Sequence, residues 1–244
     1  MNVVTISVLS QNVGENVKLQ GWVYNTRSVG KIWFLILRDG TGLLQCVAVK
    51  NEMNDESFAI GQNLNHEDSI IITGIVREEP RAPGGFELGV NSIKVVSHVT
   101  DTFPISPKEH GTDFLMKNRH LWLRSKRQYA IMRVRHQIVK AIRDFFDNNG
   151  FTLIDSPIFT GNAVEGTTTL FELDYFERQA YLTQSGQLYQ EAGAMAFGKT
   201  YCFGPTFRAE KSKTRRHLTE FWMAEPEMAY CDLDENMEWA EKYV

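Results

Sequence analysis

The sequence predicts an α+β protein in two parts, first a small barrel of strands and then an antiparallel sheet flanked by helices. Three observations support this prediction. Strand-like runs separated by turn residues fill the first hundred positions. Two prolines then mark a linker at Asp101–Lys108. Beyond the linker, apolar residues recur at the three- and four-residue steps that are typical of a helix.

The first part contains five runs rich in β-branched and aromatic residues, and a polar stretch at Met53–Gly61 can form a short helix between the third and fourth. The runs are Val17–Thr26, Ile32–Arg38, Leu43–Val49, Ser69–Arg77 and Phe86–Val96. Five strands with one helical insertion match a Greek-key barrel of the OB type, although an SH3-like barrel or half of a sandwich has a similar strand count. Trp33 and Phe34 alternate in their run, so one of them is expected outside the core.

The second part begins with a predicted amphipathic helix that Gly150 can end. Its apolar positions are Ile131, Val134, Ile138, Ile142 and Phe145. Phe151–Phe159 then predicts a strand with Pro157 near its end. Further strands are expected around Ala180–Thr183, Thr200–Phe207 and Leu218–Met228. A final helix is expected to begin near Asp232.

The composition argues against a membrane or disulfide-rich protein. Of 244 residues, 43% are hydrophobic and 23% charged, and no apolar run approaches the ~20 residues that span a bilayer. The N-terminus has no basic segment followed by an apolar one, so we expect no signal peptide. The three cysteines, Cys46, Cys202 and Cys231, are far apart and have no metal-ligand spacing. They predict reduced thiols in a cytoplasmic protein.

Charge is unevenly distributed along the chain. The net charge is −4, which argues against a general nucleic-acid binder. Residues 108–144 nevertheless hold ten Lys or Arg and only three Asp or Glu. This stretch could face phosphates, or it could be the solvated face of a helix. Charge alone favours the solvated face.

The most informative segment is Phe207–Glu227, with the sequence FRAEKSKTRRHLTEFWMAEPE. A strand ends at Arg208, a basic loop follows, and a second strand leaves through Glu220 and Phe221. Arginine binds phosphate in a bidentate manner and also stacks on a base. A cluster of basic residues in a loop is most often a solvated turn with no ligand. The order Phe-Arg-x-Glu followed by Arg-His-x-x-Glu-Phe is, however, more specific than a run of charged residues.

This hairpin resembles motif 2 of the class II aminoacyl-tRNA synthetases, in the subgroup that handles Asp, Asn and Lys. The resemblance implies that Arg208 is the catalytic arginine, binding the ATP α-phosphate and the amino-acid carboxylate. It implies that Glu210 helps to hold the adenine. The other residues implied to line the ATP site are Arg216, His217, Leu218 and Phe221. The implied chemistry is attack of an amino-acid carboxylate on the α-phosphorus, which depends on positioning and on charge stabilisation by Arg and Mg²⁺.

Three further segments resemble the same subgroup. Phe151–Thr160 resembles motif 1, which implies a homodimer formed through this region. Val164–Phe171 resembles a mobile loop that closes over the amino acid, with Glu165 contacting its α-amine. Ser185–Gln190 resembles the segment in which Ser185 and Gln187 contact the amino acid. The ordered occurrence of all three carries more weight than any one of them.

Two positions favour asparagine over aspartate. Aspartyl enzymes usually read Ser-Pro-Gln-Leu where this chain has Gly186 in place of proline, and Trp222–Glu227 resembles the asparaginyl branch. An acidic acceptor such as Glu225 suits a carboxamide NH₂ and repels a carboxylate. The resemblance therefore implies L-asparagine, ATP and tRNA-Asn as partners. An aspartyl enzyme is the alternative, and a lysyl enzyme ranks third.

In this subgroup an OB domain reads the anticodon, which implies an anticodon-binding domain at residues 1–100, a linker at 101–120 and a catalytic domain at 121–244. Gly30–Asp39 resembles the strand that carries an aromatic platform. Phe34 would stack on the central anticodon base, an interaction worth ~1–3 kcal/mol. Arg27 and Gln45 would supply hydrogen bonds beside it. A role for Phe34 in the barrel core is the alternative.

The third motif of class II synthetases, a Gly-rich segment with an Arg for the γ-phosphate, is not found before Val244. Acidic Mg²⁺ ligands near that motif are also absent, so this chain is expected to supply no metal ligand. We therefore expect an incomplete catalytic domain, inactive alone. A synthetase-like protein that binds RNA without charging it is the alternative.

Overall fold

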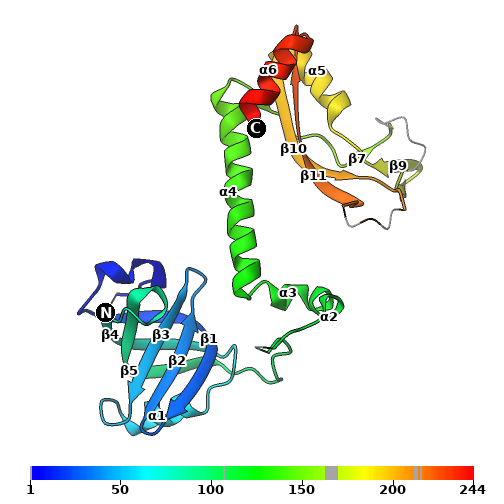
Figure 1. The fold of residues 1–244 in the computed structure, drawn as a ribbon. Helices are drawn as coiled ribbons and strands as arrows, with labels where there is room; N and C mark the ends of the chain where they lie inside the picture. The colour runs from blue at the N-terminus through cyan, green and yellow to red at the C-terminus, as the bar shows by residue number, and fades with distance from the viewer. Residues whose placement is uncertain (1, 107, 163–169, 212–213, 215) are drawn as a thin grey trace. The chain divides into compact units, whose positions relative to one another are not determined.

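The computed structural model describes residues 2–106, 108–162, 170–211, 214 and 216–244. The chain forms two compact units, Met1–Trp122 and Leu123–Val244, shown from blue to green and from green to red in Figure 1. Each unit has its own hydrophobic core. Within the described residues, no helix combines the length and the apolar composition that a bilayer crossing requires.

The first unit contains a closed barrel with the strand order β1-β2-β3-β5-β4 (Figure 1). Its strands are β1 (Asn16–Val29), β2 (Ile32–Arg38), β3 (Leu43–Val49), β4 (Ser69–Glu78) and β5 (Phe86–Ser97). β3 and β5 pair in parallel and close the barrel, whereas the other pairs are antiparallel. α1 (Asp55–Gln62) lies between β3 and β4. The predicted OB barrel with its helical insertion is therefore confirmed, and β2 and β3 have the predicted bounds.

Side-chain alternation along β2 decides which aromatic residue enters the core. Trp33 is 2% exposed and packs inside the barrel with Leu35 and Leu37. Phe34 is only half-buried, on the outer face of the same strand. The expectation that one of the two aromatic rings lies outside the core is therefore confirmed, and the outer ring belongs to Phe34.

Short helices surround the barrel and its exit. η1 (Ile6–Gln11) precedes β1, and η2 (Pro83–Gly85) lies in the connection between β4 and β5. α2 (Thr112–Lys117) and α3 (Arg119–Trp122) follow Asp101–Lys108; α2 and the start of α3 fall within the linker expected at 101–120, and the sequence did not predict either helix. The described residues of the predicted linker, 101–106 and 108, hold no helix or strand.

The second unit begins with α4 (Lys126–Asn148), whose first turn is capped by the Ser125 side chain. Gly150 follows it with φ 79°, a left-handed conformation that glycine adopts without strain. A three-stranded sheet has the order β11-β10-β6, and a second has the order β7-β9-β8. Their strands are β6 (Thr152–Leu153), β7 (Phe159–Thr160), β8 (Glu172–Tyr175), β9 (Arg178–Leu182), β10 (Lys199–Phe207) and β11 (Glu220–Met228). The helices α5 (Gln187–Phe197) and α6 (Leu233–Tyr243) complete the unit.

The predicted strand Phe151–Phe159 is wrong over its middle. Only Thr152–Leu153 and Phe159–Thr160 are paired, and they belong to different sheets. The backbone N–H of Ile154 still donates to the Tyr201 carbonyl, after which the chain leaves the first sheet. Pro157 has no backbone N–H and cannot donate a hydrogen bond between strands, so it favours a break between two short strands.

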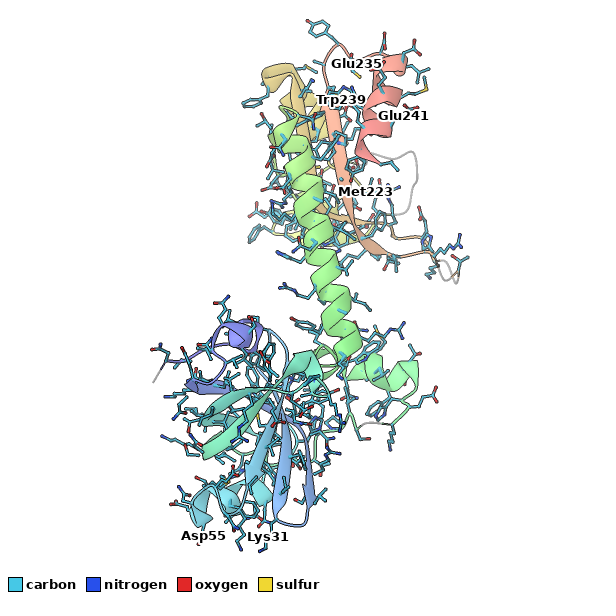
Figure 2. All side chains as sticks on the ribbon, turned by 60° about the vertical axis from the view of Figure 1, so that its left-hand side comes forward. Lys31, Asp55, Met223, Glu235, Trp239 and Glu241 are labelled. Atoms are coloured by element: carbon cyan, nitrogen blue, oxygen red, sulfur yellow. The ribbon has the colours of Figure 1, made fainter. Side chains whose placement is uncertain are left out.

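One face of the β10–β11 hairpin forms the core of the second unit. Tyr201 is fully buried, stacks on Phe146 with 4.7 Å between ring centroids, and donates its hydroxyl to Asp147 Oδ1 at 2.8 Å. Trp239 of α6, labelled in Figure 2, packs edge-on against Phe151. Because successive residues of a strand point to opposite faces, the other face of the hairpin remains for a site.

The predicted helix is confirmed, but its apolar positions divide into two groups. Ile142 and Phe145 pack against the core. Ile131, Val134 and Ile138 are 46%, 59% and 55% exposed. The apolar face of α4 is therefore covered only toward its C-terminal end within the described residues.

Candidate functional site

The second face of the hairpin carries the residues that sequence analysis selected. Cys202, Gly204 and Thr206 of β10 share this face with the residues opposite them on β11, which are Glu225, Met223 and Phe221. Arg208 comes directly after β10 and two residues after Thr206, so it continues the series of residues on this face. A Cβ added at Gly204 would have no heavy atom within 4 Å, so the face is open there.

α5 covers the far end of the same face. Thr200 Oγ1 donates to the Gln190 carbonyl at 3.3 Å. Gly193 of α5 approaches closely, since a Cβ there would lie 2.9 Å from Ile154 Cδ1. The face is therefore closed by α5 at one end and open toward the hairpin loop at the other. A ligand with an extended shape can lie along it.

Three donors hold the carboxylate of Glu225 at the closed end. Ser185 Oγ donates to its Oε1, and the backbone N–H of Gly186 donates to its Oε2 at 2.9 Å. The thiol of Cys202 lies 3.4 Å from the same Oε2. A carboxylate has about four lone-pair sites, so this one can still accept a hydrogen bond from a ligand.

Glu225 and burial also control the chemistry of Cys202. Burial raises the pKa of the Cys202 thiol to about 12, and the charge of Glu225 and its hydrogen bond contribute in the same direction. The thiol therefore stays protonated and acts as a weak donor rather than as a nucleophile. Sequence analysis had given Cys202 no site role. The register of the hairpin places Cys202 opposite Glu225. Counting residues along both strands from the loop would have predicted this pairing from the sequence.

Gly186 is the second residue whose role in the site was not predicted. A Cβ at this position would lie 2.5 Å from Cys202 Sγ and 2.7 Å from Ser156 Oγ, closer than real Cβ contacts. Its N–H is used by Glu225, a hydrogen bond that proline cannot make. Gly186 therefore meets two requirements at once, a backbone N–H donor and the absence of a side chain.

Gln187 lies one residue further, exposed at the start of α5. Its backbone N–H donates to Ser185 Oγ at 3.1 Å, and its side-chain Nε2 donates to Glu191 Oε1 at 2.9 Å. Burial, with the charges of Glu191 and Glu225, raises the pKa of the nearby Glu227. Several carboxylates thus lie close together here, and such a place favours a cationic group such as an amino-acid ammonium.

The loop end of the hairpin holds the residues predicted for ATP. The backbone N–H of Arg208 donates to the Thr219 carbonyl at 3.0 Å, which closes the hairpin loop. The N–H of Phe207 donates to the Thr183 carbonyl at 2.8 Å, and this bond ties the strand end to the segment just before Ser185. Arg208 is therefore anchored on both sides by backbone hydrogen bonds.

The remaining predicted ATP residues lie in and around the loop. Glu210 Oε2 and His217 Nε2 are 3.6 Å apart, so the structure brings these two side chains together. Phe221 is half-buried on the open face, whereas Leu218 is 62% exposed and Arg216 is also exposed. Glu165, predicted for the amino acid, lies outside the described residues.

The predicted anticodon residues meet on the outer face of the barrel. Arg27, Phe34 and Gln45 line one pocket of about 240 Å³, together with Asn25, Thr26 and Ile36. The guanidinium carbon of Arg27 lies 4.5 Å from the centroid of the Phe34 ring, a cation–π geometry. The pocket thus combines an aromatic surface, a cation and an amide, which suits a nucleobase.

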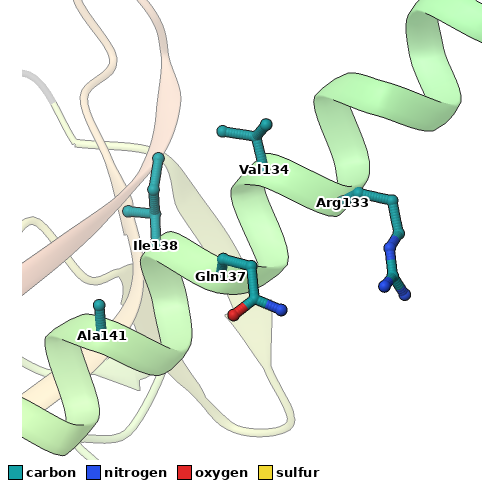
Figure 3. Close-up of a pocket in the computed structure, with 5 residues that line it drawn as sticks. All are labelled: Arg133, Val134, Gln137, Ile138 and Ala141. Atoms are coloured by element: carbon teal, nitrogen blue, oxygen red, sulfur yellow. The ribbon is translucent and has the colours of Figure 1, made fainter.

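A second hollow, of about 460 Å³, lies along α4. Figure 3 shows the residues that line it, with Val134 and Ile138 on the same side of the helix and Arg133 pointing elsewhere. The hollow is almost purely apolar and shares no residue with the two sites above. In the part of the chain that the structure describes, no three His, Cys, Asp or Glu side chains form a group suited to a metal ion.

Comparison with known proteins supports this division into two sites. Residues 111–244 match the family model of "tRNA synthetases class II (D, K and N)". Residues 17–96 match the model of an "OB-fold nucleic acid binding domain". The two matches cover the hairpin site and the barrel pocket respectively.

Curated relatives are similar over the whole chain. The asparagine–tRNA ligase of Sorangium cellulosum is 59% identical over 242 residues, covering 99% of this chain and 54% of the relative. The ligase of Desulforamulus reducens is 59% identical over 236 residues, covering 97% of this chain and 54% of the relative. The chain thus spans about half the length of the curated relatives it matches.

Solved structures show the same relationship. The asparaginyl-tRNA synthetase of Pyrococcus horikoshii complexed with asparaginyl-adenylate superposes with a TM-score of 0.93 at 41% identity, covering 100% of this chain and 57% of that one. A putative aspartyl-tRNA synthetase from Leishmania major superposes with a TM-score of 0.86 at 29% identity, covering 99% and 51%. The predicted α+β fold, with a barrel followed by synthetase elements, is confirmed. The chain belongs to the class II tRNA synthetases of the D, K and N family.

Proposed function

We propose that this chain is part of an enzyme that ligates L-asparagine to tRNA-Asn, using ATP and passing through asparaginyl-adenylate. The observation that carries the proposal is the carboxylate of Glu225, held by Ser185, Gly186 and Cys202 at the closed end of the hairpin face. The curated relatives named asparagine–tRNA ligase, at 54–59% identity, support it. Among the solved structures, the asparaginyl enzymes are 30–41% identical and the aspartyl ones 27–29%.

Glu225 is proposed to select the carboxamide. An acceptor held in place by three donors welcomes the NH₂ of an asparagine side chain and repels the carboxylate of aspartate. Ser185 would fix this carboxylate, and Gln187 would contact the amino acid from the first turn of α5. Glu165 is proposed for the α-amine, a role that rests on the resemblance alone.

Arg208 is proposed as the catalytic residue of the first step. The carboxylate of asparagine attacks the α-phosphorus of ATP, and the bond to pyrophosphate breaks. The ribose hydroxyl of the tRNA end then attacks the carbonyl, and AMP leaves. Negative charge develops on the oxygens bound to the α-phosphorus in the first step, and a positioned guanidinium stabilises it without a protein nucleophile.

ATP is proposed to lie along the open part of the hairpin face. The space over Gly204, the half-buried Phe221 and the cation of Arg208 fit a nucleotide better than a neutral ligand. The Glu210–His217 pair would hold the adenine, and Arg216 and Leu218 would border the site. Mg²⁺ bound with ATP would neutralise phosphate charge. The described residues include no group of three His, Cys, Asp or Glu side chains that could hold it.

The barrel pocket is proposed as the anticodon site of residues 1–100, with 101–120 as a linker and 121–244 as catalytic domain. Phe34 would stack on the central anticodon base, between the cation of Arg27 and the amide of Gln45. Support comes from the pocket that these three residues line together. The match to a nucleic-acid-binding OB model supports it as well.

The enzyme is also proposed to act as a homodimer in the cytoplasm. The dimer would form through Phe151–Thr160, where Ile158 and Phe159 are 43% and 52% exposed. Apolar side chains of that size on a surface are suited to an interface.

The proposal is tested by charging tRNA transcripts with labelled asparagine, using the complete polypeptide that contains these residues. Acylation of tRNA-Asn with asparagine is the expected result. Acylation with aspartate instead would make the protein an aspartyl enzyme. Tight binding of tRNA without any acylation would identify an RNA-binding relative that lacks the activity.

A further inference from the structure

Asp68 places a carboxylate where burial makes one costly. It lies just before β4, and it is 0% exposed. Among the described residues, three donors reach its carboxylate. The backbone N–H of Asn65 donates to Oδ2 at 2.8 Å, His98 Nδ1 lies 3.0 Å from the same oxygen, and the backbone N–H of Val99 donates to Oδ1 at 2.7 Å. A carboxylate only accepts, so the His98 ring carries its hydrogen on Nδ1.

Two of these three donors belong to the segment by which the chain leaves the barrel. β5 ends at Ser97, and His98 and Val99 are the next two residues on the way to the linker. If His98 and Val99 moved away, Asp68 would keep only the N–H of Asn65 among these donors. A buried carboxylate that loses its donors is strongly destabilising. Asp68 therefore stabilises the docked position of this exit segment.

The loop that carries Asp68 is itself held to the barrel. The N–H of Val23 donates to the Asp68 carbonyl at 2.9 Å, and the N–H of Glu67 donates to the Val23 carbonyl at 2.7 Å. Glu67 has φ 72°, which is uncommon for a residue other than glycine. Its side chain is 2% exposed and accepts from Arg38 Nη2 at 2.7 Å. A strained backbone persists only where its surroundings hold it, so this loop is a fixed support for the exit segment.

The same loop makes a second contact further along the linker. The His66 ring meets the Phe103 ring edge-on, with 4.8 Å between the ring centroids. Phe103 is half-buried, although residues 101–106 form no helix or strand. Hydrogen bonds of regular secondary structure therefore do not order this part of the linker, and side-chain contacts with the barrel take that role. The linker is docked at two successive points, first on Asp68 and then on His66.

We propose that Asp68 is a positioning residue for tRNA, because it restrains the linker where the chain leaves the barrel. The inference rests on the proposed function, in which one tRNA occupies both the barrel pocket and the hairpin site. When two sites bind one ligand, the effective concentration at the second site depends on the length and stiffness of their connection. A connection that is ordered before the ligand arrives also lowers the entropic cost of binding. Loss of the Asp68 contact should therefore weaken binding of whole tRNA and leave each separate site unchanged.

The test measures three quantities on the complete polypeptide that contains these residues. They are the KM for tRNA-Asn in charging, the affinity for a hairpin RNA that carries the asparagine anticodon, and the rate of ATP–pyrophosphate exchange with asparagine. Asp68→Ala is expected to raise the KM for tRNA by on the order of tenfold. The hairpin affinity and the exchange rate are expected to stay at their wild-type values. General unfolding could not produce that split, because it would lower all three.

His98 offers variants that leave Asp68 in place. Its side chain is 58% exposed, so replacing it creates no cavity in the core. His98→Ala removes one donor and should raise the KM for tRNA, although less than Asp68→Ala does. His98→Asn keeps an N–H donor near the position of Nδ1 and should restore the wild-type KM. Thr100→Ala is the control, since it removes a polar side chain from an exposed residue just beyond the exit segment, and it should keep the wild-type KM.

A double variant tests whether the two residues act through one contact. Asp68→Ala combined with His98→Ala should have the same KM for tRNA as Asp68→Ala alone, because the acceptor is already gone. A further rise in the double variant would show that His98 acts by another route, and it would overturn the proposed contact.

The outcomes separate this inference from the proposed function. If wild type and Phe34→Ala bind the anticodon hairpin equally, the anticodon site is wrong. If Phe34→Ala loses affinity while Asp68→Ala and His98→Ala keep the wild-type KM for tRNA, only the role of Asp68 is overturned. Equal losses for the hairpin and for whole tRNA would also overturn it, since the defect would then lie in the barrel pocket. If Asp68→Ala does not fold, as judged by thermal unfolding, the comparison of His98→Ala with His98→Asn decides.

Discussion

The backbone N–H of Gly186 donates to Oε2 of Glu225 at 2.9 Å, so the first residue before α5 holds the carboxylate that faces the proposed amino-acid site. The contact joins two segments that are distant in sequence. It also explains why glycine stands at this position. Proline would remove the donor, and any side chain would collide with Cys202 and Ser156.

Gly186→Ala is therefore expected to destabilise the second unit. Its Cβ would lie 2.5 Å from Cys202 Sγ, so the neighbours must shift, at a cost of about 1–3 kcal/mol. The control is Gly204→Ala, because a Cβ there meets no atom within 4 Å. The control should change the free energy of unfolding by less than about 0.5 kcal/mol. Urea unfolding measures both, and equal effects would contradict the account.

The three thiols are expected to differ in reactivity. Burial raises the pKa of Cys46 and of Cys202, the latter to about 12. Burial and the charges of Glu235 and Asp232 also raise the pKa of Cys231, but this thiol is only partly buried and is therefore accessible to a reagent. Alkylation of the folded chain at about pH 8, followed by mass spectrometry, should therefore modify Cys231 first. In urea all three should react at similar rates. Early modification of Cys202 in the folded chain would contradict the packing described around Glu225.

Stability of the second unit is expected to fall as the pH rises above 9. Burial, with Asp147, raises the pKa of Tyr201 from 10.0 to about 12, and that of Cys202 rises from 9.0 to about 12. The unfolded chain therefore releases these protons at lower pH than the folded chain does, and the free energy of unfolding declines between about pH 9 and 12.

Thermal unfolding across this range measures the decline. Tyr201→Phe removes one titrating group, so its stability should be lower at neutral pH but should fall less steeply with pH. A slope that is unchanged in the variant would show that Tyr201 does not contribute to the decline.

Much of the barrel could be predicted from local patterns in the sequence. The runs of β-branched and other apolar residues at Ile32–Arg38 and Leu43–Val49, with turn residues on either side, predicted β2 and β3 with their observed bounds. These runs could not tell whether Trp33 or Phe34 enters the core, because both rings are large and apolar. Closure of the barrel by the β3–β5 pair decides it, and that pair joins segments about forty residues apart.

Long-range contacts set the limits of prediction in the second unit. The Pro157 segment was expected to be one strand, yet its two ends pair with different sheets. The motif at Ser185–Gln190 was identified from the sequence, but the sequence did not predict that the helix α5 begins within it. The three donors around Glu225 depend on the hairpin register and on the approach of α5. Neither of these is visible in any short window of sequence.

Phe34→Ala is expected to weaken binding of the asparagine anticodon hairpin by on the order of tenfold or more, because a stacked base contributes ~1–3 kcal/mol. Phe176→Ala is the control, since Phe176 is a 91% exposed ring in the second unit. Fluorescence anisotropy measures both affinities at one salt concentration. Equal affinities for the two variants would remove Phe34 from the anticodon site.

Arg208→Lys is expected to lower the rate of asparagine activation by about 10²–10³ in the complete enzyme, because a point charge replaces a planar group suited to phosphate. Lys211→Gln, in the same loop, removes an exposed charge and should have a small effect. Single-turnover formation of asparaginyl-adenylate measures the difference. A normal rate for Arg208→Lys would exclude it as the residue that stabilises charge at phosphorus.

The most direct test of the central claim is ATP–pyrophosphate exchange by the complete polypeptide, with asparagine and aspartate measured in parallel. If Glu225 selects a carboxamide, exchange depends on asparagine, and aspartate gives a kcat/KM lower by at least on the order of a hundredfold. Exchange that responds more strongly to aspartate would contradict the account.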